Sequence, residues 1–202
     1  MFLDILKKVI NIFINTLLKR SEANHTNNSR VDKDQAKEID ETEVAWSHYV
    51  IETKVTSPFG KRKHPYDPKK TQFHNGTDYT GRGNKYAKAP CDCIIEKVVA
   101  PDPKYPYKYV YDGGKFVYTS PPKGRAWTPY MVLRALHNPN LKFIYRHGEN
   151  LSPVGTTVWC GQDIYLLDNY GFSKGIHLHV EVLLNDKEID PDAFIKEKIM
   201  GA

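Results

Sequence analysis

Five side chains in this 202-residue sequence have the types and spacing of a one-metal hydrolase: His74 and Asp78, a lone His147, and the pair His177 and His179. A water molecule that attacks at neutral pH needs a metal with three protein ligands, an open fourth position and a nearby base. The five side chains supply three ligands and leave two imidazoles over for proton transfer. Zinc is the metal that this combination favours.

The pair His177 and His179 lies in a run that is predicted to form a β-strand. Residues two apart on a strand point to one face, so both imidazoles are expected to enter one pocket while Leu178 points into the core. Glu181 is expected to share the histidine face. Taken alone, such a pair is more typical of a half-exposed strand than of a site.

The other two signals are also weak when taken singly. His74 and Asp78 are good zinc ligands, and Gly76 between them would permit a sharp bend that brings them together. A lone histidine such as His147 is more often a surface or core residue. The three signals together, in this order and with glycine-rich connections, indicate a site.

Three stretches carry a family resemblance. TSPFGKRKHP (residues 56–65) and FHNGTDY (residues 73–79) resemble the opening of the lysostaphin/LytM-type zinc endopeptidase domain, metallopeptidase family 23. YRHGENLSPVGTTVWCGQDIYLLDNYGFSKGIHLHVEV (residues 145–182) is similar to its second half. The resemblance extends from about Ser57 to Phe194.

The resemblance implies a role for each of the five residues. His74, Asp78 and His179 would bind Zn2+, with water in the fourth position. His177 would be the general base, and His147 would orient the water or stabilise the tetrahedral intermediate. The implied function is a zinc metalloendopeptidase that hydrolyses peptide bonds in the stem peptides or cross-bridges of bacterial peptidoglycan.

Departures from the family pattern concern the groove walls. Asn169, Gly171, Ser173 and Gly175 are kept in the turn before His177, whereas four of its residues differ: Asp168, Tyr170, Lys174 and Ile176. These differences affect substrate choice more than activity. Two alternatives stay open: a non-catalytic wall-binding or structural module on the same fold, and a peptidase that acts on protein substrates.

The elements that must position these residues are predicted to form a mainly β fold. Short runs rich in β-formers alternate with turn residues from residue 46 onward, which predicts an antiparallel β domain over residues 46–202. The resemblance implies that this domain has two β layers and a substrate groove. Strands are expected over 48–51, 94–99, 131–136, 143–145, 162–165 and 177–184, a hairpin turn at 112–114, and a closing helix that begins near Asp190 or Asp192.

Two segments precede this domain. Residues 1–20 form a predicted amphipathic helix, and residues 21–45 are a polar linker or arm with almost no large apolar residues. The helix needs a partner for its apolar face: other protein subunits, a membrane interface, or its own domain. It does not fit a signal peptide, because Asp4 stands where positive charge is expected. A phage structural protein, delivered to the cell wall with the virion tail through residues 1–45, fits a wall enzyme of this kind. A membrane-associated or lysis-time enzyme is the alternative.

Composition narrows the partners further. A net charge of +5 is compatible with an anionic polymer, but no basic run or zinc-finger pattern points to nucleic acid, so none is expected. The three cysteines, Cys91, Cys93 and Cys160, are read as idle thiols in preference to a second metal site. The tyrosine- and lysine-rich stretch over 100–128 is either an edge hairpin or a contact for sugars or anionic wall polymer.

Overall fold

The computed structural model describes residues 43–51, 53–65, 67–81, 83–101, 110–112, 115–117, 128–171, 173 and 175–201. The helix predicted for residues 1–20, most of the arm predicted for 21–45 and most of the 100–128 stretch lie outside these residues. The predicted division of the chain into these segments therefore stays a prediction. Within the described part, no helix is long and apolar enough to cross a bilayer.

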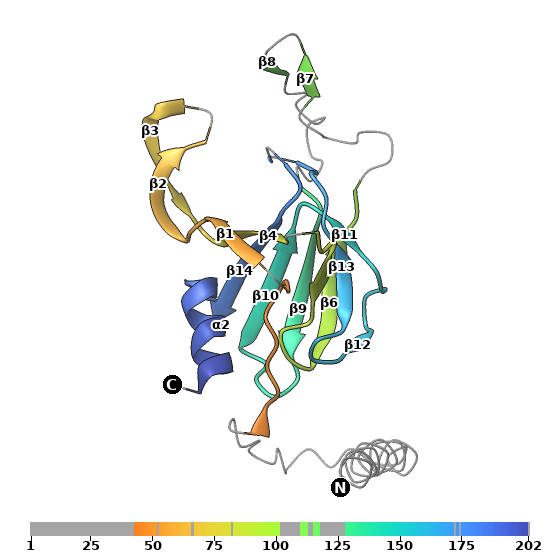
Figure 1. Ribbon diagram of the computed structural model, residues 1–202. Coiled ribbons are helices and arrows are strands. Elements are labelled where there is room, and N and C mark those ends of the chain that lie inside the picture. Colours follow the sequence, from red (N-terminus) through yellow and green to blue (C-terminus); the bar gives the residue numbers. More distant parts are fainter. Residues whose placement is uncertain are drawn as a thin grey trace, which may run out of the picture. The chain divides into compact units, whose positions relative to one another are not determined.

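A large antiparallel sheet forms the body of the domain (Figure 1). In the part of the chain that the structure describes, its strands lie in the order β1 (Thr53–Ser57), β4 (Thr77–Gly81), β14 (Leu178–Leu184), β10 (Leu141–Arg146), β9 (Tyr130–Ala135), β6 (Cys93–Val99) and β12 (Thr157–Val158), and β15 (Lys187–Ile189) also pairs with β14.

Alternation of side chains explains the central strands of this sheet. In β10, Leu141, Phe143 and Tyr145 are buried, while the residues between them are half-buried. Strand β9 repeats the pattern with Met131 and Leu133 in the core. Because successive strand residues point to opposite faces, one face of the sheet forms the core and the other is left for polar side chains.

A second, smaller sheet covers the core face. It contains β11 (Glu149–Asn150), β13 (Asp163–Leu166) and β5 (Tyr86–Lys88). The buried rings of Tyr145 and Tyr165 meet between the two sheets with centroids 5.9 Å apart, and the Tyr145 hydroxyl donates to the Lys88 carbonyl at 2.7 Å. The prediction of a mainly β, antiparallel two-layer domain is confirmed.

Two pairs of strands form separate β-hairpins. Strands β2 (Gly60–His64) and β3 (Asp67–His74) form one, and β7 (Val110–Asp112) and β8 (Lys115–Val117) form the other. Asp112 lies opposite Lys115 in the second hairpin. Residues 113 and 114 of the predicted turn lie outside the described residues.

The closing helix α2 (Pro191–Met200) begins where the sequence predicted. The Asp190 side chain caps it by accepting from the backbone N–H groups of Asp192 and Ala193. The helix packs on the domain through Phe194, whose ring lies against Phe143 and Trp46.

The strand predicted for residues 48–51 is wrong. These residues form bends and a turn, although Tyr49 and Val50 are buried in the core. The apolar residues of this segment pack in the core without forming a strand, and the Tyr49 ring lies against Tyr79 and Tyr145. The other predicted strands correspond to β6, β9, β10, β13 and β14.

Candidate metal centre and active site

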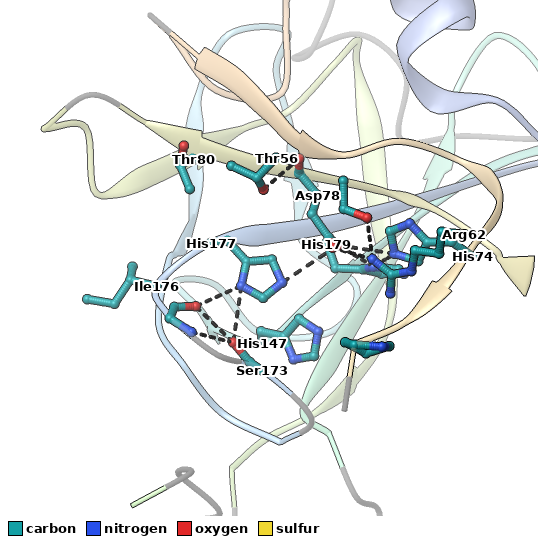
Figure 2. A pocket seen from close by; sticks show the side chains of 13 residues that line it. Thr56, Arg62, His74, Asp78, Thr80, His147, Ser173, Ile176, His177 and His179 are labelled. Carbon is teal, nitrogen blue, oxygen red and sulfur yellow. Dashed lines mark hydrogen bonds and ion pairs between the residues drawn. The ribbon is translucent and has the colours of Figure 1, made fainter. Parts of the chain in front are cut away.

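Three side chains from different strands converge on one point (Figure 2). His74 is the last residue of β3, Asp78 lies in β4 and His179 in β14. One ligand atom from each lies within 4.8 Å of the other two. His179 Nδ1 is 2.8 Å from Asp78 Oδ1, and His74 Nε2 is 3.1 Å from His179 Nδ1 and 3.3 Å from Asp78 Oδ1.

Sheet register brings two of these residues together. Asp78 and His179 are directly opposite each other in the pairing of β4 with β14, and side chains at such positions project from the same face. Gly76 lets the preceding turn approach β14, because a Cβ added there would lie 2.2 Å from the Val180 carbonyl oxygen. Glycine is therefore needed at position 76 because the turn lies too close to the backbone of β14 for a larger residue. The sharp bend expected from the sequence does not require a left-handed φ at this position.

Hydrogen bonds fix which imidazole nitrogens face the cluster. His74 donates from Nδ1 to the Pro58 carbonyl at 2.9 Å, which leaves Nε2 without a proton. His179 places Nε2 3.2 Å from the Glu181 carboxylate, which leaves Nδ1 for the cluster. Ligating histidines commonly hand their second N–H to a carbonyl or a carboxylate in this way. The two nitrogens and one carboxylate oxygen form a metal-binding group of the kind that holds zinc.

The charges of the cluster suit a cation. Burial would raise the pKa of Asp78, but hydrogen bonds with His179 and His74 outweigh it and hold the pKa far below its usual value. Burial likewise opposes ionisation of Glu181, yet its contacts with His179 and Arg146 lower the pKa to about 2. Both carboxylates are therefore ionised at neutral pH.

The two remaining histidines lie beside this group. The ring centroid of His147 is 4.7 Å from that of His177 and 5.8 Å from that of His179. His147 donates from Nδ1 to the Tyr170 carbonyl at 2.7 Å, and His177 donates from Nδ1 to the Gly175 carbonyl at 2.7 Å. In both rings Nε2 is thus the nitrogen with a free lone pair, and that of His177 is 3.6 Å from Asp78 Oδ1.

Burial keeps both of these histidines neutral. It lowers the pKa of His147 well below the ordinary value, and the neighbouring imidazoles add to the effect. It also lowers the pKa of His177, although the Asp78 carboxylate opposes the shift. Each ring is therefore unprotonated at neutral pH.

An open cavity of about 430 Å³ gives access to the cluster. All five predicted residues line it. The remaining lining residues are Thr56, Ser57, Arg62, Pro65, Thr80, Ser173, Gly175 and Ile176.

Comparisons with known proteins add to this geometry. No family model matches the chain. The chain is 30% identical over 142 residues to an uncharacterized metalloprotease of Haemophilus influenzae, and the match covers 69% of this chain but only 25% of that protein. The solved structure of LytU has a TM-score of 0.51 at 21% identity, covering 76% of this chain and 91% of that one. Lysostaphin from Staphylococcus simulans also has a TM-score of 0.51, at 19% identity, covering 74% of this chain and 52% of its own.

The described domain has the lysostaphin-type peptidase fold. Within this fold the structure gathers all five predicted residues at one cavity. One detail of the sequence prediction is wrong: His177 does not lie in β14. It precedes the strand in an isolated bridge with Asp168, and its Nδ1 lies near the Gly175 carbonyl and the Ser173 hydroxyl.

Sequence reasoning gave no role to several residues that contact the five or their partner Glu181. Ser173 is buried and lies 3.1 Å from His177 Nδ1. Arg146 binds Glu181 with Nε at 2.7 Å, and Arg62 contacts Asp78. Glu181 was placed on the histidine face by alternation, and its contact with His179 agrees. The contact of Arg146 with Glu181 depends on the pairing of β10 with β14, and the contact of Arg62 with Asp78 depends on where the β2–β3 hairpin lies. No spacing in the sequence indicates either.

Proposed function

We propose that this chain is a zinc metalloendopeptidase that hydrolyses peptide bonds in the stem peptides or cross-bridges of bacterial peptidoglycan. One observation carries the proposal: His74, Asp78 and His179 form a compact ligand group with two further neutral imidazoles at the same open cavity. The likeness of the fold to lysostaphin-type peptidase domains and the metalloprotease relative support it.

His74, Asp78 and His179 would hold the zinc ion. When bound, zinc lowers the pKa of a coordinated water from about 15.7 to about 7 and polarises the scissile carbonyl. The protein's own contribution is to aim the three ligands at one point, because the Pro58 carbonyl and the Glu181 carboxylate hold the rings of His74 and His179 in place.

His177 is proposed as the general base. Its Nδ1–H is committed to the Gly175 carbonyl, and its Nε2 lies toward Asp78, so the free lone pair is available for the proton of the attacking water. The same nitrogen can return that proton to the leaving amine.

His147 is proposed to orient the water. With Nδ1–H donated to the Tyr170 carbonyl, its neutral ring offers the site an acceptor at Nε2. This tautomer suits holding a water hydrogen, whereas donation to a developing oxyanion requires the ring first to take up a proton.

The test combines metal content with turnover. Purified protein should contain about one zinc per chain and should release new amino termini from cell-wall sacculi, as the three-ligand site requires. A chelator or the His179→Ala substitution should abolish release with the fold retained. Full activity of a His74→Ala variant would contradict the proposal.

The same experiment separates the alternatives. Zinc bound with no turnover of any substrate would favour a non-catalytic wall-binding module. Faster cleavage of unfolded proteins than of sacculi and glycine-rich peptides would favour a peptidase of protein substrates. Mass spectrometry of the digested sacculi would name the bond that is cut.

For delivery we propose association with a phage virion, through residues 1–45 and subunits of the tail. The amphipathic pattern of residues 1–20 supports an attachment segment. Detection of the chain in purified virions, and its loss when residues 1–45 are deleted, would support this role. Binding of residues 1–20 to lipid vesicles without virion association would favour the membrane alternative.

A further inference from the structure

Arg62 links a separate hairpin to the candidate metal centre. It lies in β2, which pairs with β3 and with no strand of the main sheet among the described residues. Its side chain is only 23% exposed and lines the cavity. Nη1 lies 3.3 Å from Asp78 Oδ2 and also donates to the Ser57 hydroxyl.

The opposite strand of the hairpin holds the rest of the guanidinium. Gln72 is the cross-strand partner of Arg62. With its amide oxygen turned toward the guanidinium, Gln72 accepts from Nε and Nη2, each at 3.2 Å. Arg62 is therefore bound at three points, from β3, from the end of β1 and from Asp78, and its fork is already committed within the protein.

The two oxygens of Asp78 consequently have different surroundings. Oδ1 faces the imidazoles, at 2.8 Å from His179 Nδ1 and 3.3 Å from His74 Nε2. Oδ2 faces the Arg62 guanidinium. A carboxylate held through one oxygen by a fixed charged donor cannot rotate freely, so the other oxygen stays directed at the cluster.

We propose that Arg62 is a positioning residue that orients Asp78, so that Oδ1 is the oxygen offered to the metal, and that it ties the β2–β3 hairpin to the metal centre. This inference rests on the proposed function in so far as it concerns zinc. It differs from a role in reading a substrate carboxylate, because the nitrogens of the guanidinium are already engaged by Ser57, Gln72 and Asp78.

The experiment measures the zinc dissociation constant of the full-length protein by competition with a chelating indicator. Arg62→Met should weaken zinc binding about 10- to 100-fold, as expected when an outer partner of a ligand is lost. Arg62→Lys keeps the positive charge but not the forked guanidinium, so its zinc affinity should lie between that of the wild type and that of Arg62→Met. Lys63→Met is the matched control, since it removes the same charge from the next position of β2 and should bind zinc like the wild type.

Each outcome decides the question. The proposal requires weakened zinc binding in every Arg62 variant that folds by circular dichroism. Wild-type zinc affinity together with a raised KM would overturn it and assign Arg62 to substrate binding instead. A wild-type protein that binds no zinc would contradict the proposed function. A wild-type protein that binds zinc as tightly as its Arg62 variants would contradict only the role of Arg62.

Discussion

At the scale of single residues, His147 joins a functional imidazole to an unusual backbone. Its φ is 75°, in the left-handed region that few residues other than glycine, asparagine and aspartate adopt. Holding a histidine there costs on the order of 1–3 kcal/mol. The conformation turns the chain after β10 so that the ring lies beside His177.

His147→Asn should separate the backbone from the side chain. Asparagine tolerates the left-handed conformation, so the melting temperature should stay near that of the wild type. The imidazole is lost, and kcat on sacculi should fall about 10²- to 10⁴-fold. Zinc affinity should be unchanged. A variant that keeps the wild-type kcat would contradict the proposed role.

His147 also predicts how stability varies with pH in the metal-free protein. Burial lowers its folded-state pKa well below 6.5, so between that value and about 6.5 the unfolded chain binds more protons than the folded one. The contribution of His147 to stability should therefore fall as the pH drops from about 7.5 to 5, whereas the raised pKa of His179 contributes in the opposite direction. Urea unfolding should show a smaller fall in His147→Asn than in the wild type, and equal slopes would contradict this assignment.

Glu181 offers a second test of the outer partners. Glu181→Gln removes the charge that Arg146 and His179 share, and zinc affinity should fall about 10- to 100-fold. Glu96→Gln is the control, because Glu96 pairs with Arg134 and Lys142 and contacts none of the proposed zinc ligands. Competition with a chelator measures both variants, and equal affinities would show that Glu181 does not support His179.

Much of the site was predictable at this scale, and the reason is chemical. The five residues belong to types that bind zinc or move protons, and their motifs survive in the printed sequence with a familiar spacing. Arg62 and Arg146 escaped prediction because arginines occur on most surfaces. Only the folded pairing of strands shows which of them reach a carboxylate.

At the scale of elements, apolar alternation decided what could be predicted. Strands β9, β10 and β14 were found because their apolar core residues alternate over several positions, and β6 was found because it is rich in isoleucine and valine. Strands β2 and β3 were missed, since GKRKH and DPKKTQFH carry charge and little apolar pattern. Their pairing is held by backbone hydrogen bonds along the hairpin, which leave no trace in composition.

The approach of the β3–β4 turn to β14 makes a prediction at this scale. Gly76→Ala places a Cβ 2.2 Å from the Val180 carbonyl oxygen and 2.7 Å from His179 Nε2. The strands must shift, so the free energy of unfolding should fall by about 1–3 kcal/mol and zinc binding should weaken. Gly175→Ala is the stability control, because a Cβ there meets nothing within 4 Å. Urea unfolding that shows equal loss in both variants would contradict the argument.

At the scale of the whole molecule, the metal should contribute to folding stability. The ligand group exists only in the folded chain, so zinc should stabilise it by mass action, by about 2.7 kcal/mol at a free zinc concentration 100 times the dissociation constant. Calorimetry should show a melting temperature that rises with zinc and falls with a chelator. His179→Ala should lose this response, and an unchanged response would place the zinc elsewhere.

The direct opposition of Asp78 and His179 across β4 and β14 has a consequence for assembly. A slip of one residue between these strands would turn every side chain of one of them to the other face, and Leu178 or Val180 would stand where the imidazole now stands. Only a correctly aligned sheet could then retain the ion. Chains with a misaligned sheet would thus fail to bind zinc and would be inactive.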